Sequence, residues 1–221
     1  MSKRDTKNII LDAAETLFSR RSYGEVTFRK IAERAGLHVS QIVYHFQSKE
    51  LLMEAVINRR ASGLNEERIG LLESYRRVLG DEKMEVEPII RAFLDPYFQD
   101  RLADNQGWRN YSALVGKIVW DKRFAATMND AYDWVAKRYI DALMSAAPTV
   151  SEEHIQRAFQ FLLAAMFSAG ANNKRIDRLS GGKFSSEDYN AIYEVIIPFI
   201  VGGFKALEGT REATDETLES Q

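Results

Sequence analysis

TFRKIAERAGLHVSQIVYHF, residues 27–46, contains two short helical patterns separated by a glycine. The hydroxyl of Thr27 can cap the first helix, which then continues for about two turns. Gly36 lies at the break, where a small residue lets two short helices cross at a steep angle. The segment therefore predicts a helix-turn-helix whose second helix can lie in a DNA major groove.

The second of these helices is expected to have one buried side and one side free for DNA. Its apolar residues Ile42 and Phe46 should face Ile31 and the helix that precedes the motif. The outward side chains are the candidates for DNA contact, namely Val39, Ser40, Gln41, Tyr44 and His45. A Tyr-His-Phe sequence at a helix end is by itself more often a packing feature, so the interpretation depends on the whole segment.

Apolar spacing along the rest of the chain predicts helices, so the fold class is all-α. The low numbers of proline and glycine, 4 and 13, also favour helix over a turn-rich strand fold. The expected helices span residues 6–21, 27–35, 39–47, 48–56, 69–79, 89–98, 108–120, 123–146, 151–170 and 186–207. Four basic side chains are expected to be solvated on helix faces, with a position near DNA as the alternative for the first two: Arg20, Arg21, Arg59 and Arg60.

These helices predict a three-part organisation. Residues 1–47 form an N-terminal three-helix DNA-binding domain with the helix-turn-helix, and residues 48–207 form a C-terminal helical domain for effector binding and dimerisation. Residues 208–221 carry five acidic residues against a single arginine and are predicted to be a disordered acidic tail.

Composition limits the class of protein. The chain has 221 residues, 45% of them hydrophobic, which is enough for a core. The absence of cysteine fits a reducing compartment, and neither a signal peptide nor an apolar stretch of membrane length is expected, so we predict a cytoplasmic protein. The net charge of -2 hides a small basic surplus in residues 1–50, which hold nine Lys or Arg and six Asp or Glu.

Three blocks of the sequence resemble the DNA-binding domain of TetR-family transcriptional regulators. The blocks are ILDAAETLF at residues 10–18, TFRKIAERAG at 27–36 and YHFQSKELL at 44–52. The resemblance implies a homodimer that binds a near-palindromic DNA operator and is released or altered by a small molecule in its second domain. The remainder of the chain matches this family only in length and helical character.

The resemblance also assigns roles to residues of the helix-turn-helix. Thr27, beside Phe28, would present its amide and hydroxyl to a phosphate, and Arg29 and Lys49 would add charged phosphate contacts. Tyr44 and His45 would reach the DNA backbone, while Val39, Ser40 and Gln41 would face base edges, where Gln41 can pair with adenine.

Two positions depart from the family pattern. His38 stands where a Ser or Thr usually caps the recognition helix, and it is therefore a candidate DNA contact. Val43 replaces a frequent tyrosine and removes one hydroxyl that could reach a phosphate.

Catalytic and metal sites are not expected. The three histidines are His38, His45 and His154, and no pair of them has metal-ligand spacing. The sequence Gly181-Gly182-Lys183 lacks the rest of a phosphate-binding loop and is interpreted as an interhelical loop. We therefore predict no enzymatic activity, no metal and no cofactor.

Aromatic residues are concentrated between Phe93 and Trp134, where an effector pocket is expected. The candidate lining residues are Arg91, Trp108, Arg109, Tyr111 and Asn172. The expected effector is a small apolar, amphipathic or aromatic molecule, with an acid group as one option because arginine could bind it.

The last two apolar helices, residues 151–170 and 186–207, are expected to form a four-helix dimer interface. The alternative is that both are buried within a monomer. The predicted function is a ligand-responsive DNA-binding regulator, most simply a repressor. The alternatives are a helical small-molecule-binding or interaction protein whose helix-turn-helix is only architectural, and a helical enzyme.

Overall fold

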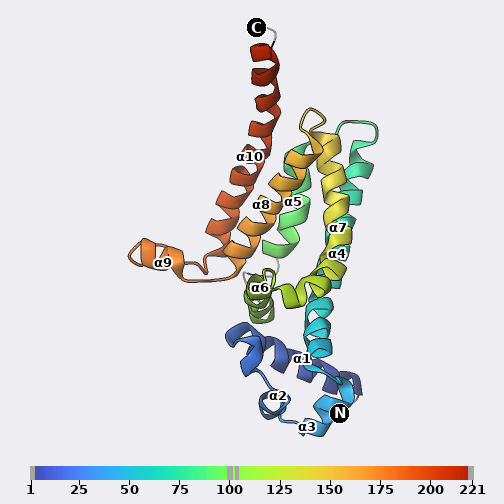
Figure 1. The fold of residues 1–221 in the computed structure, drawn as a ribbon, viewed down its shortest axis with the longest axis vertical. Helices are drawn as coiled ribbons and strands as arrows, with labels where there is room; N and C mark the ends of the chain where they lie inside the picture. The colour runs from blue at the N-terminus through green and yellow to red at the C-terminus, as the bar shows by residue number, and fades with distance from the viewer. Residues whose placement is uncertain (1–2, 99–101, 103–104, 219–221) are drawn as a thin grey trace.

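The computed structural model describes residues 3–98, 102 and 105–218, and these residues form helices and no strand, as the sequence predicted (Figure 1). The α-helices are α1 (Lys3–Arg20), α2 (Phe28–Ala35), α3 (Val39–His45), α4 (Lys49–Leu79), α5 (Val86–Tyr97), α6 (Gln106–Ile118), α7 (Ala125–Ala146), α8 (Glu152–Gly170), α9 (Arg175–Leu179) and α10 (Tyr189–Leu218).

Helices α1 to α3 and α4 as far as Ala61 form the head of the molecule, at the lower end of Figure 1. Their buried apolar residues form one cluster that includes Phe18, Ile31, Ile42 and Val56. Residues of α6 belong to the same cluster, so the head packs directly on α6. Helix α4 is a single 31-residue helix that begins just after the predicted boundary at residue 47, belongs to the head as far as Ala61 and continues into the second part of the molecule.

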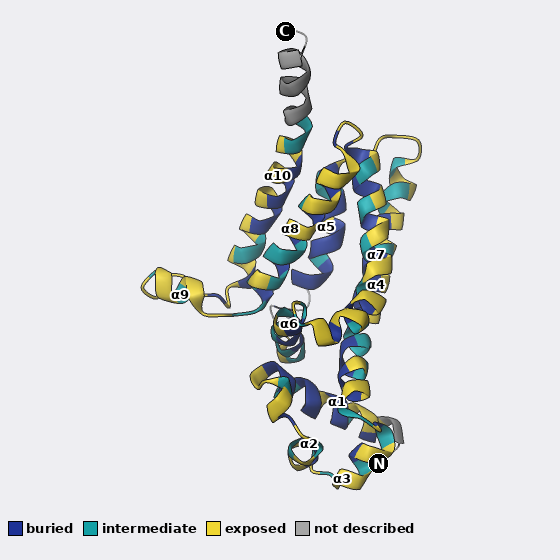
Figure 2. Ribbon diagram, in the orientation of Figure 1, coloured by how far each residue is buried: buried dark blue, intermediate teal, exposed yellow. Residues whose placement is uncertain are grey.

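The body comprises the rest of α4 and helices α5 to α10. Its largest cluster joins side chains of α4, α5, α7, α8 and α10 around Phe93, Tyr139 and Phe159. Figure 2 shows the buried residues along the sides of these helices that face one another. The bundle therefore supplies a core separate from that of the head, and α6 lies between the two.

Charged residues join the head to α4. Arg59 and Arg60, which the sequence predicted to be solvated, bind Glu15, a side chain only 2% exposed. Arg59 also pairs with Asp12 at 2.7 Å. The apolar pattern of α1 gives no sign of these ion pairs, because they join residues more than forty positions apart.

Helix α10 is longer than predicted. It extends to Leu218, into the segment predicted as a disordered tail, and residues 219–221 lie outside the described part of the chain. Within α10, Tyr189–Glu208 is long and apolar enough to cross a membrane by length and composition, where none was expected. Core helices of soluble proteins pass the same test, so this window is weak evidence for a membrane span.

Candidate DNA-binding surface and ligand cavity

The turn between α2 and α3 has the geometry that its sequence predicts. Thr27 caps α2 by accepting a hydrogen bond from the amide of Lys30. Gly36 has φ 65° and ψ 35°, a left-handed conformation that glycine adopts without strain, and its amide bonds back to α2. Ser48 caps α4 in the same way as Thr27 caps α2. The helix-turn-helix is therefore fixed by local contacts.

Helix α3 turns the predicted base-reading side chains outward. His38, Val39, Ser40 and Tyr44 are exposed, and Tyr44 is the most accessible large side chain of the helix at 66%. Gln41 and His45 are partly buried, whereas Ile42 is fully buried in the head. The arrangement leaves one continuous face of α3 available to a partner.

Gln41 already has a partner at the start of α3. Its side-chain oxygen accepts a hydrogen bond of 3.0 Å from the amide of His38, so Gln41 supplies the reciprocal bond of a capping box, which satisfies the amide of the N-cap residue itself. A carboxamide oxygen has two lone pairs, so Gln41 can still accept one hydrogen bond and donate another in a paired contact to adenine.

The two basic residues predicted to contact phosphate differ in their surroundings. Arg29 is exposed and makes no hydrogen bond or ion pair with the described residues, beside the capping residue Thr27 and the half-buried Phe28. Lys49 donates to the carbonyl oxygens of Tyr23 and Val26 at 2.9 and 3.1 Å, and its ammonium lies 4.1 Å from the centre of the Tyr23 ring. Lys49 therefore ties α4 to the loop before α2, whatever contact it makes with DNA.

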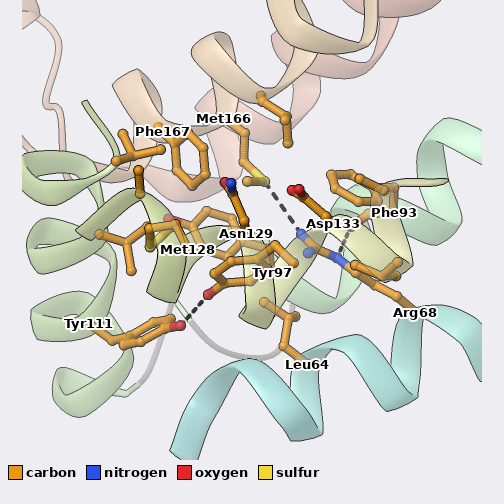
Figure 3. A pocket seen from close by; sticks show the side chains of 17 residues that line it. Leu64, Arg68, Phe93, Tyr97, Tyr111, Met128, Asn129, Asp133, Met166 and Phe167 are labelled. Carbon is orange, nitrogen blue, oxygen red and sulfur yellow. Dashed lines mark hydrogen bonds between the residues drawn. The ribbon is translucent and has the colours of Figure 1, made fainter. Parts of the chain in front are cut away.

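A cavity of about 190 Å³ lies in the body between α4, α5, α6, α7 and α8. Most of its wall is apolar, formed by residues such as Leu64, Phe93, Met128 and Phe167 (Figure 3). Asn129 and Asp133 line it from α7 and are exposed to solvent, which places them at its edge. The cavity is thus an apolar chamber with a polar rim.

Of the five residues predicted to line an effector pocket, Tyr111 lies in the wall of this cavity. Arg91 lies outside it, paired with Glu87 and bonded to the hydroxyl of Tyr193. Trp108 packs between the two cores, under the guanidinium of Arg60.

The other two candidates also lie elsewhere. Arg109 donates to the carbonyl oxygen of Leu102, and Asn172 binds Glu187 and Ser186 beside a separate surface depression. The five residues therefore do not form one site.

The cavity contains an arginine that the sequence analysis did not select. Arg68 is 1% exposed, and it lies on α4 between the buried residues Leu64 and Leu72, four positions from each. A charged residue on an otherwise apolar helical stripe was the available signal.

The hydroxyl groups around the cavity are engaged with protein partners. Tyr97 bonds to Ser112, which donates to the carbonyl oxygen of Gly170 at 2.7 Å. Tyr111 bonds to Tyr132. Burial raises the pKa of Tyr97, Tyr111 and Tyr132, so all three stay neutral.

Two contacts join α6, which forms part of the cavity wall, to the head. The hydroxyl of Tyr111 donates to the carbonyl oxygen of Ile57 on α4 at 3.3 Å. On the same helix, α6, the ammonium of Lys117 donates to the carbonyl oxygen of Ser19 at the end of α1. Helix α6, which contributes Tyr111 to the cavity wall, is therefore bonded directly to α1 and α4.

No group of three or more His, Cys, Asp or Glu side chains suited to a metal ion occurs within the described residues. An exposed recognition helix, a head built around it and an apolar chamber in contact with that head define the molecule as a helical, two-part DNA-binding regulator. The sequence comparisons agree with this class. Residues 10–56 match the family described as "Bacterial regulatory proteins, tetR family", and residues 91–203 match "Tetracyclin repressor-like, C-terminal domain". The chain belongs to the TetR family of transcriptional regulators.

Individual relatives agree with the family. The HTH-type transcriptional repressor KstR2 of Rhodococcus jostii (strain RHA1) is 23% identical over 162 residues, which cover 72% of this chain and 76% of that protein. The fatty acid degradation regulator FadR of Bacillus halodurans has a similar fold, with a TM-score of 0.58, 15% identity and coverage of 87% of this chain and 94% of that chain. A transcriptional regulator from Saccharomonospora viridis in complex with choline gives a TM-score of 0.56 at 18% identity and covers 87% and 96% of the two chains.

The protein is accordingly a DNA-binding transcriptional regulator, and the alternative of an architectural helix-turn-helix is not supported. Regulators of this family bind DNA operators and small-molecule effectors, typically as dimers, and are generally not enzymes. The residues of this chain that contact DNA and effector remain predictions.

Proposed function

We propose that the protein is a repressor that binds a near-palindromic operator as a homodimer and releases it when a small molecule occupies the cavity. The observation that carries this proposal is the position of the cavity, whose wall residue Tyr111 is bonded to α4 of the head. A ligand that favours one position of α6 over another would change the separation of two heads in a dimer.

DNA contact is assigned to the exposed face of the helix-turn-helix. His38, Val39, Ser40 and Gln41 would enter the major groove, with Tyr44 and His45 on the flanking backbone. Thr27, Phe28, Arg29 and Lys49 would meet phosphates at the ends of α2 and α4. Two heads related by a twofold axis would contact successive major grooves on one side of the duplex.

The dimer interface is assigned to α8 and α10. Phe161 of α8 and Val195 and Phe199 of α10 are each at least 66% exposed, which is unusual for large apolar side chains on a free surface. An apolar groove of about 490 Å³ runs between the two helices. A second copy of the same pair of helices would cover this face in a four-helix arrangement, and it would also cover the apolar window of α10.

A gel-shift experiment with the DNA that flanks the gene tests the regulator. We expect a complex that resists nonspecific competitor and weakens steeply with salt, because phosphate contacts release counterions. Sedimentation of the free protein at low micromolar concentration tests the interface, and a species that remains at 25.2 kDa would contradict it.

The names of the relatives do not fix the effector. One neighbour regulates fatty acid degradation and another was solved with choline, which carries a positive charge, and both are less than 20% identical to this chain. The chemical class of the effector has to come from the cavity of this protein.

A further inference from the structure

Arg68 is a charged side chain inside an apolar cavity, and no acidic residue in the described part of the chain pairs with it. Its side chain is 1% exposed, and no carboxylate of the described residues lies within 4.0 Å of its guanidinium. Glu15, the other charged residue that is buried among those the structure describes, has two arginine partners. Arg68 therefore differs from the ordinary case, in which a buried charge is paired.

The protein satisfies the guanidinium of Arg68 only in part. Its Nε donates to the carbonyl oxygen of Phe93 at 2.8 Å, which is a normal hydrogen bond. The two terminal nitrogens each have one contact of 3.4 Å: the one to the side-chain oxygen of Asn65 is long for a hydrogen bond, and the one to the sulfur of Met166 is of ordinary length for that larger atom. A guanidinium has five N–H groups and a thioether is a weak acceptor, so donors remain for a ligand (Figure 3).

The charge of Arg68 persists despite burial. Desolvation lowers the pKa of Arg68 to about 10, so the guanidinium is still protonated at neutral pH. Its centre lies 3.8 Å from the centre of the Phe93 ring, a contact that offsets part of the desolvation without neutralising the charge. An anion entering the cavity would find a desolvated cation whose attraction water does not screen.

We propose that the cavity binds a small monocarboxylic acid with an aryl or short alkyl body, whose carboxylate pairs with the guanidinium of Arg68. The body would contact the apolar wall formed by residues such as Val115, Met128 and Phe167. An apolar cavity of about 150 Å³ accommodates a benzene ring, and the 190 Å³ of this cavity leaves room for one carboxylate in addition. The inference rests on the proposed function only in treating this cavity as the effector site.

Asp133 also lines the cavity, and its carboxylate would favour a cationic ligand over an anionic one. Its side chain is exposed at the rim, where water and salt weaken its interaction with a bound cation. A cation would also have to share the chamber with Arg68. The buried charge therefore decides in favour of an anion.

Three molecules of nearly identical shape and different charge test this inference on the full-length protein without DNA. Benzoate, benzamide and benzamidine carry negative, zero and positive charge at neutral pH. We expect calorimetry or equilibrium dialysis to show benzoate binding at least about tenfold more tightly than the other two, since a charge-assisted pair exceeds a neutral hydrogen bond by that much.

Substitutions of Arg68 distinguish the contribution of its charge to ligand preference from the contribution of the cavity's shape. In Arg68→Met the preference for benzoate over benzamide should vanish, whereas Arg68→Lys should retain part of it. Arg91→Met is the matched control, because Arg91 is a basic residue of the body that lies outside the cavity, and it should keep the full preference. Helical circular dichroism and thermal unfolding of each variant check that the body is folded.

Equal binding of benzoate and benzamide by the wild-type protein would overturn the inference, as would tighter binding of benzamidine or no binding of any of the three at millimolar concentration. A preference for benzoate that survives in Arg68→Met would overturn the role of Arg68. Each of these results leaves the DNA-binding function intact, because gel-shift with the operator region measures that function independently.

Discussion

The head and the body each bury a charged side chain, but the one in the head is paired with opposite charges and the one in the body has neutral neighbours among the described residues. Glu15 of the head is 2% exposed and accepts hydrogen bonds from Arg59 and Arg60. Arg68 of the body is 1% exposed and has neutral neighbours in the described part of the chain. A buried charge with its partner in the chain fixes structure, whereas one without such a partner marks a place where an outside molecule can supply it.

The largest expected effect comes from removing the paired charge. Glu15→Ala leaves Arg60 partly buried without a carboxylate partner and leaves Arg59 with Asp12 alone, and we expect the free energy of unfolding to fall by about 3 kcal/mol. Urea unfolding measures the change. Glu54→Ala, at an exposed position on α4, is the matched control and should change stability by less than about 0.5 kcal/mol. Similar small effects of both substitutions would show that the ion pairs do not hold α1 to α4.

The body depends on close packing where the head depends on ion pairs. A methyl group on Gly170 would collide with the hydroxyl oxygens of Tyr97 and Ser112, so Gly170→Ala should destabilise the protein by about 2 kcal/mol. Gly63→Ala is the control on an open helix surface and should stabilise by up to about 1 kcal/mol. Thermal unfolding of both variants distinguishes them by sign, and a stabilising Gly170→Ala would refute the packing at the end of α8.

The unpaired charge should behave differently from Glu15. Arg68→Met removes the cost of a desolvated cation and keeps an apolar side chain, so we expect the free energy of unfolding to rise by about 1–2 kcal/mol in the absence of ligand. Chemical denaturation of the ligand-free protein gives the value. A loss of more than about 1 kcal/mol would mean that the contacts of Arg68 with Phe93, Asn65 and Met166 are structural, and the contrast with Glu15 would disappear.

The same contrast explains what could be predicted from the sequence. The helix-turn-helix was predicted because Thr27, Gly36 and Ser48 act on residues within a few positions of themselves. The cavity was not located because five helices from distant parts of the chain converge on it. Arg91 and Arg109 were selected for their place among aromatic residues in the sequence, yet both point to other partners. Arg68 was missed because the predicted helices ended at residue 56 and began again at residue 69, whereas α4 is one helix that continues through Arg68 and buries it.

The smallest expected effects concern two basic residues at the surface of the head. One of them is bonded to other described residues of the protein and the other is not, as with the buried charges Glu15 and Arg68. Arg29 is exposed and without a bond to the described residues, whereas Lys49 is held by the carbonyl oxygens of Tyr23 and Val26. Arg29→Ala should weaken operator binding by about 1 kcal/mol, or about fivefold, and reduce the salt dependence by about one phosphate contact. Its thermal unfolding should match that of the wild-type protein.

Lys49→Ala should lower the stability of the head by about 1 kcal/mol, since two carbonyl oxygens lose a charged donor. The part of any loss of DNA affinity that comes from unfolding should disappear when binding is measured well below the unfolding temperature. The part that remains there reports the phosphate contact proposed for Lys49. Gel-shift across a salt series, together with thermal unfolding, separates the two variants. The opposite result would be a change of stability in Arg29→Ala and a change of salt dependence alone in Lys49→Ala. In that case the hydrogen bonds that a basic residue makes in the free protein do not reveal whether it supports the fold or contacts DNA.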